Sequence, residues 1–255
     1  MRNVLRLIWF DLKQELKPPV WILVEWFIFT VQLFIYGALI SRLVTAPEIS
    51  NYQQFYAVGF IVMITFDIGT HTGRHFVEDA HEGRLPYLLS LPISRTKLFL
   101  SIALQGGFEL ALMLTVPLAI TLFLLGNLAV LSVAAAIITL FGLGFGVAGL
   151  MLGLSFIAFK SSDMYTAIVT GLSTIIIRFS TVFYPLIFLP QGYASIASIS
   201  PLTYGADLVR FLLGFDPSIL LNPAYAVAVL TALAVSTLGL GMVLLQRLVE
   251  GVKSA

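Results

Sequence analysis

Six apolar runs of membrane-spanning length follow one another along this chain of 255 residues. A helix needs about 20 mostly apolar residues to cross the hydrocarbon core of a bilayer. Only 11% of the residues are charged, against about 25% in an ordinary soluble domain, and 59% are hydrophobic. A soluble fold of this size could not hide so many apolar side chains from water. The sequence therefore predicts an all-α integral membrane protein.

The six predicted transmembrane helices belong to one transmembrane domain, 1–255. A short cytoplasmic helix is predicted before the first span, at 1–19. A charged loop at 75–97 follows the second span, and an extracytoplasmic segment rich in Pro, Gly and Ser at 189–222 follows the fifth. The spans are expected at 21–41, 52–74, 98–125, from the turn at 126–127 to 159, 165–188 and 224–245.

Basic residues are concentrated on one side of these spans. Eleven of the 14 Lys and Arg residues fall in the N-terminal segment, the loops after the second and fourth spans, and the C-terminal tail. The loops of the other side hold only Arg42 and Arg210, and Arg178 falls within the fifth span. Cytoplasmic loops carry the excess of Lys and Arg. Both termini are therefore predicted to be cytoplasmic, in a multi-pass protein of the cytoplasmic membrane.

The N-terminal segment has the pattern of a helix that lies along the membrane surface. Its cations share one side of a helical wheel, and an apolar edge lies beside them. Such a helix places its charges towards anionic headgroups and its apolar edge at the acyl boundary. Membrane lipid is thus an expected partner of Arg2, Arg6, Trp9, Lys13 and Lys17.

Four charged residues lie in or near the predicted spans: Glu25, Asp67, Glu109 and Arg178. Each costs about 2.5–3.5 kcal/mol at a helix centre, so each is expected to face protein or water. A proton or ion pathway is one interpretation of these charges. A structural ion pair or an interface position is the other, and it is the one we favour.

The sequence holds no convincing catalytic, nucleotide or metal site. His71 and His75 have the helical spacing of zinc peptidases, but the glutamate needed as general base is replaced by Thr72. Acidic residues and His81 that follow could complete a metal site, yet they also suit an ordinary solvated segment. Lys160 and Ser161 lack the glycines of a phosphate-binding loop, and a net charge of +1 gives no reason to expect nucleic acid.

Residues 82–95 of the charged loop form the first of two more specific patterns. A short helix with an apolar face is predicted between Pro86 and Pro92, flanked by charge. Ser94 is the expected N-cap of the next helix. A loop with this much apolar surface indicates a protein partner.

The second pattern covers residues 183–190 and 199–210, near the predicted outer face. Prolines are expected to break the fifth span there. Beyond them, four apolar side chains recur on one side of a short amphipathic helix: Tyr204, Leu208, Phe211 and Phe215. This arrangement is typical of a re-entrant or interfacial element.

With these two patterns in order on opposite sides of the membrane, the sequence resembles the ABC-2 family of ATP-binding-cassette exporter permeases, most closely the drug- and antibiotic-resistance branch. The resemblance implies a permease that pairs with a second copy of itself and with two copies of a separate ATPase subunit. ATP and Mg would bind to that ATPase, and this chain would hold no cofactor and no metal. The second and fifth spans would line the path between the two copies.

The resemblance also assigns roles to particular residues. The segment 82–92 would be the coupling helix seated on the ATPase, with the N-terminal helix as its interfacial neighbour. The coupling residues would be Glu82, Arg84, Tyr87, Leu88, Leu91, Pro92 and Arg95. An outer gate within 189–215 and its approach would include Tyr184, Pro185, Pro190, Pro201, Tyr204, Asp207 and Arg210.

The function expected from the resemblance is ATP-driven export of an amphipathic, drug-like or lipid-like substrate. One alternative is export of a lipid-linked polysaccharide or a polymer resembling teichoic acid. Another is an ion-coupled secondary carrier that uses Glu25, Asp67 and Glu109. An intramembrane hydrolase is disfavoured, because the Ser residues of the fourth and fifth spans have no histidine on any later span.

Overall fold

The computed structural model describes residues 20–43, 49, 51–84, 87, 90, 94–157 and 161–253. Within these ranges the regular elements are all helices, with no strand. The all-α expectation is confirmed.

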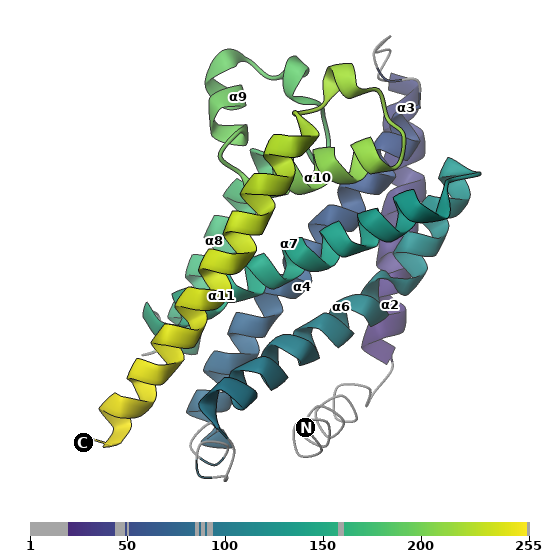
Figure 1. Cartoon of the computed structure of the whole chain (residues 1–255). Helices are drawn as coiled ribbons and strands as arrows, with labels where there is room; N and C mark the ends of the chain where they lie inside the picture. The colour runs from purple at the N-terminus through teal and green to yellow at the C-terminus, as the bar shows by residue number, and fades with distance from the viewer. Residues whose placement is uncertain are drawn as a thin grey trace.

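Long helices that alternate in direction build the body of the molecule (Figure 1). The first is α2 (Val20–Gln32), which continues through the π-helical turn η1 (Leu33–Gly37) into α3 (Ala38–Leu43). The others are α4 (Tyr52–His81), α6 (Arg95–Leu125), α7 (Val130–Ile157), α8 (Ser162–Arg178) and α11 (Pro223–Lys253).

Four short elements lie together between α8 and α11. They are η2 (Leu186–Phe188), α9 (Gln191–Ala197), α10 (Pro201–Leu212) and η3 (Pro217–Ile219). In Figure 1 α9 and α10 lie at one end of the bundle, and the last turns of α4 and α11 lie at the other. The end of α4 and the beginning of α6 are therefore on the side away from α10.

Helix α4 is the centre of the packing, in contact with α6, α7, α8 and α10. Small residues allow the close approach of α4 and α7. A Cβ added at Gly69 of α4 would lie 2.8 Å from the Val147 side chain of α7, and one at Gly144 of α7 would lie 3.4 Å from the Thr65 side chain of α4. Glycine faces let apolar helices pack closely when lipid supplies no hydrophobic drive.

Among the described residues, four helices are long and apolar enough to span a membrane: Ile22–Arg42, Tyr52–Asp79, Leu104–Leu125 and Val130–Ser155. These coincide with the first four predicted spans. The apolar part of α11 is shorter, at Pro223–Thr237, and α8 has 17 residues. A multi-pass membrane protein is therefore supported, without the full count of six.

Two predicted boundaries differ from the structure. Helix α4 continues past Arg74 to His81, because the charged residues beyond Arg74 form ion pairs along the helix surface. Helix α8 ends at Arg178 rather than at 188, where the Phe179 N–H closes the last turn on the Ile175 carbonyl. The prolines expected to break this span instead begin later elements, with Pro185 before η2 and Pro190 before α9.

Helix α10 is buried rather than amphipathic at a surface. Every residue from Leu202 to Arg210 is buried, and Pro201 occupies the first turn. The helix packs against α4, α7 and α11. Arg210, which the sequence placed among loop cations, is 0% exposed. The stripe of Tyr204 and Leu208 is present, but the polar side of the helix faces protein as well.

Candidate functional site

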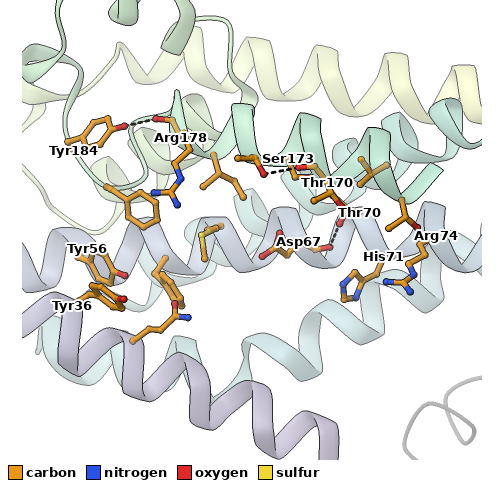
Figure 2. A pocket seen from close by; sticks show the side chains of 18 of the residues that line it. Tyr36, Tyr56, Asp67, Thr70, His71, Arg74, Thr170, Ser173, Arg178 and Tyr184 are labelled. Atoms are coloured by element: carbon orange, nitrogen blue, oxygen red, sulfur yellow. Dashed lines mark hydrogen bonds between the residues drawn. The ribbon is translucent and has the colours of Figure 1, made fainter. Parts of the chain in front are cut away.

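A groove of about 820 Å³ runs along the face between α4, α8 and the segment from α2 to α3. Figure 2 shows side chains of α4 and α8 pointing into it from facing helices. The second and fifth spans, which the resemblance assigned to the path, thus both line the groove. The lining changes in character along its length.

Aromatic side chains form one stretch of the groove. The Tyr56 ring stacks on Phe60 and on Phe183, with centroids 5.6 Å apart in both pairs. The Tyr52 hydroxyl donates to the Phe183 carbonyl at 2.7 Å. Tyr36 and Tyr184 also line this stretch (Figure 2). The contacts fix a broad aromatic wall that a planar or apolar molecule can pack against.

Polar side chains form the other stretch. Hydroxyls of α8 face the charged residues of α4 across the groove. The Arg74 Nε donates to the Glu78 carboxylate at 2.9 Å, and the Thr70 hydroxyl donates to the Asp67 backbone carbonyl at 2.6 Å. The polar lining of this stretch consists of Asp67, Thr70, His71, Arg74, Thr166, Thr170, Ser173 and Thr174, whereas Arg178 lies beside Tyr184 at the aromatic stretch (Figure 2). The groove therefore suits an amphipathic molecule.

A side chamber of about 210 Å³ adjoins the groove between α2, α4 and α6. Three of the four charged residues predicted within the spans line it: Glu25, Asp67 and Glu109. The His71 Nδ1 lies 3.7 Å from the Glu109 carboxylate. Arg178 does not join them, since it is an exposed residue at the end of α8. The structure thus brings together carboxylates from three helices, α2, α4 and α6.

Arg210 binds two other segments of the chain, α4 and the turn after α8, at the end of the bundle that holds α10. Its guanidinium donates to the carbonyls of Thr181 at 2.6 Å, Val182 at 2.7 Å and Phe55 at 3.1 Å. The guanidinium carbon lies 3.5 Å from the centroid of the Phe55 ring. The planar fork of arginine suits several acceptors at once.

Asp207 is the counter-ion of this cluster. Its carboxylate lies 3.5 Å from the Arg210 guanidinium, accepts the Thr181 hydroxyl at 2.8 Å, and accepts the Leu221 N–H at 3.1 Å. The chain before α11 is thereby bound to the turn after α8. A Cβ added at Gly59 would lie 1.8 Å from the Val182 carbonyl oxygen, so only glycine fits beneath this turn.

The remaining residues assigned to the outer gate are spread over the same end. The Tyr204 hydroxyl donates to the Ser198 carbonyl, and the Tyr184 hydroxyl donates to the Arg178 carbonyl. Of the assigned residues, Tyr184 is the one that lines the groove. Pro185, Pro190 and Pro201 shape the beginnings of η2, α9 and α10.

The coupling residues are described in part. Glu82 caps α4, and Gly83 takes φ +78°, a left-handed conformation that lets the chain leave the helix. Arg84 pairs with Asp79 at 3.3 Å, and Tyr87 is 64% exposed. Arg95 begins α6, preceded by Ser94 at the N-cap position without a capping side-chain bond. Leu88, Leu91 and Pro92 lie outside the described residues.

The interfacial-helix residues Arg2, Arg6, Trp9, Lys13 and Lys17 also lie outside the described residues.

The two histidines considered as metal ligands lie near the end of α4. His75 Nδ1 lies 3.5 Å from the Glu78 carboxylate, whereas His71 Nδ1 lies 3.7 Å from the Glu109 carboxylate. The two histidines therefore have different partners. Within the described ranges, no three His, Asp or Glu side chains converge as metal ligands.

Several residues of these sites carry no signal in the sequence. Phe55 and Thr181 accept hydrogen bonds from Arg210 through their backbone carbonyls, a group that every residue has. Tyr56, Thr170 and Ser173 look like ordinary span residues until α4 and α8 are placed face to face. His71 was singled out only as a metal candidate, and its contact with Glu109 required the packing of α4 on α6.

Comparison with known proteins adds two findings. A family model described as ABC-2 type transporter matches residues 2–214. A protein of Porphyra purpurea named "Putative transport permease ycf38" is 30% identical over 166 residues. That match covers 64% of this chain, and the chain spans only 56% of the relative's length.

Proposed function

The chain belongs to the ABC-2 type transporter family, and from this premise we propose that it is the permease subunit of an ATP-driven exporter. It carries an amphipathic, drug-like or lipid-like substrate out across the cytoplasmic membrane. The observation that carries this proposal is the groove between α4 and α8, with an aromatic stretch and a polar stretch in one continuous lining. An amphipathic molecule finds a matching surface for each of its parts there.

The proposed assembly contains two copies of this chain and two copies of an ATPase. The groove is open along one side, and apolar side chains of α2, η1 and α3 beside it are exposed, including Phe27, Phe34 and Leu39. A second copy would close the groove and cover these side chains. The ATPase would bind beneath 82–95, where the exposed Tyr87 and the Asp79–Arg84 pair lie. ATP and Mg belong to that partner.

The mechanism is alternating access. ATP binding closes the two ATPase subunits and moves the segments 82–95 with them. Helices that pack in two discrete arrangements then expose the groove to one side of the membrane or to the other. Net transport requires that the substrate bind the two arrangements with different affinity. In the proposed topology of six spans with both termini in the cytoplasm, the segment 82–95 would face the ATPase, as this cycle requires.

A co-purification experiment tests the ATPase partner. The tagged chain is isolated from its native membrane in mild detergent, and the proteins that accompany it are identified by mass spectrometry. We expect an ATPase with a phosphate-binding loop, released by the double substitution Arg84→Glu and Leu88→Asp. The matched control carries Asn127→Asp and Ser195→Asp, at exposed positions away from 82–95. A partner that is absent, or that survives the first pair, contradicts the proposed coupling surface.

A groove-filling substitution tests the path separately. Thr170→Trp places a large side chain in the groove from α8, so we expect ATP-dependent substrate release from vesicles to fall at least tenfold while the ATPase still co-purifies. Thr115→Trp, at an exposed position of α6 outside the groove lining, is the control. Equal transport by the two variants would place the path elsewhere.

The carboxylates of the side chamber keep the ion-coupled carrier as a second candidate. Such a carrier moves its substrate without ATP, driven by an ion gradient, and stops when Asp67 and Glu109 are neutralised. Transport that persists in vesicles without the ATPase, and that collapses with the ion gradient, would replace the exporter by this carrier. Loss of transport on removing ATP would retain the exporter.

A further inference from the structure

We propose that the side chamber binds the cationic part of a substrate, a lipophilic organic ammonium ion. This inference rests on the proposed function, since the chamber adjoins the proposed substrate path, and it names the chemical class of one cargo. The chamber and the groove share Gln32, Phe60, Met63, Asp67 and His71 in their linings. A ligand head held in the chamber can therefore keep its tail in the groove.

Glu109 provides the most buried charge of the chamber. The residue is 5% exposed, on a helix that contributes no basic residue to the lining. Among the described residues, its ion-pair partner is the His71 Nδ1 at 3.7 Å. Burying a carboxylate costs free energy, and a ligand cation beside it can offset part of that cost.

The charge balance of the chamber favours a cation. Among the residues that the structure describes, its lining has three carboxylates, Glu25, Asp67 and Glu109, and one basic side chain, His71. Arg74, one turn beyond His71, is paired with Glu78 at 2.9 Å and does not line the chamber. With the three carboxylates ionised, the described lining stays negative even when His71 is protonated.

The rest of the chamber is aromatic and apolar, which selects an organic cation over a hydrated metal ion. Phe29 and Phe60 lie 5.1 Å apart with tilted rings. The Trp26 indole N–H donates to the Met113 carbonyl at 3.1 Å, which holds the indole in place. Aromatic faces and polarizable sulfur attract ammonium groups whose substituents are apolar. The chamber thus combines carboxylates for charge with aromatic faces for substituents.

Direct binding of a defined probe tests the proposal without the ATPase. The full chain is placed in lipid nanodiscs, and binding of tritiated benzyltrimethylammonium is measured against empty nanodiscs. Neopentylbenzene, which replaces the charged nitrogen by carbon at the same shape, serves as the neutral competitor. We expect saturable binding that unlabelled benzyltrimethylammonium displaces and that neopentylbenzene displaces at least tenfold more weakly.

Neutral variants locate the binding. Glu109→Gln and Asp67→Asn are expected to weaken probe binding about tenfold each, because each removes one carboxylate from the chamber. Glu78→Gln is the matched control, since it neutralises a carboxylate of α4 outside the chamber lining, and we expect its affinity to stay within twofold. Size-exclusion profiles of the variants check that they remain folded.

Each outcome decides for or against the proposal. Equal displacement by the neutral compound, or undiminished binding to Glu109→Gln, overturns it. Were both chamber variants to misfold, the comparison of charged and neutral compounds on the unaltered chain would still decide. This result is also separable from the proposed function. If the ATPase co-purifies with the chain but the chain does not bind the cation, the exporter proposal is retained and only this class of substrate is excluded.

Discussion

Arg210 illustrates how one charged residue can organise a membrane protein from within. Among the fully buried side chains it is the largest, and its fork reaches carbonyls on both α4 and the turn after α8. Replacing it by lysine keeps the charge but leaves carbonyl acceptors without donors. We expect Arg210→Lys to lower the free energy of unfolding by about 3 kcal/mol, within the range for a broken buried pair. Thermal unfolding followed by tryptophan fluorescence measures the loss.

The control for this prediction is Arg178→Lys, at an exposed arginine at the end of α8. We expect its unfolding temperature to stay close to that of the unaltered chain. Equal destabilisation by the two substitutions would show that the fork of Arg210 is not what binds these segments together.

Two buried tyrosines, Tyr165 and Tyr204, differ in whether their hydroxyl has a hydrogen-bond partner. The Tyr165 hydroxyl is buried without a hydrogen-bond partner, whereas the Tyr204 hydroxyl donates to Ser198. An unpaired buried hydroxyl costs about 1–3 kcal/mol, and a satisfied one contributes about 1 kcal/mol. We therefore expect Tyr165→Phe to raise the unfolding temperature and Tyr204→Phe to lower it. The same sign for both in thermal unfolding would contradict the assigned environments.

At the scale of elements, the close approach of α4 to the turn after α8 depends on Gly59. A methyl group there would meet the Val182 carbonyl and lie 2.6 Å from the Arg210 guanidinium. We expect Gly59→Ala to destabilise the protein by at least about 2 kcal/mol, since rigid backbone must move. Gly142→Ala, on α7 with open space around it, should be neutral or stabilising by up to about 1 kcal/mol. Denaturation of the two purified variants in detergent compares them.

The sequence predicts the long helices well and the elements around α10 poorly, for a physical reason. Runs such as 52–74 are recognisable from their hydropathy, because a transmembrane helix must be apolar whatever it contacts. Helix α10 shows an apolar stripe that indicates a surface helix, yet Asp207 and Arg210 on its other side are buried as a pair. Their partners lie on α4 and at 181–182, and no local pattern reveals contacts so distant in the chain.

The residues of the candidate sites also differ in how far the sequence predicts them. Glu25, Asp67 and Glu109 are conspicuous in the sequence as charges within apolar runs, and the cost of such charges predicts that they face protein or water. Their convergence on one chamber depends on how α2, α4 and α6 pack. The groove residues Tyr56 and Ser173 have no such mark, because aromatic and hydroxyl side chains are common in spans. The sequence therefore indicates which charges matter, and the packing determines what they form.

At the scale of the whole molecule, the number of spans decides on which side α9 lies. The chain has no cysteine, so single substitutions can report topology. With six spans, Ser195→Cys in α9 and Asn127→Cys in the turn after α6 face the outside, and Ser90→Cys faces the cytoplasm. We expect a membrane-impermeant maleimide to label the first two in intact cells and the third only after permeabilisation. If α7 were the last span, Ser195→Cys would behave like Ser90→Cys. That result would leave α8 and α11 outside the bilayer, and the groove between α4 and α8 could not be a path across it.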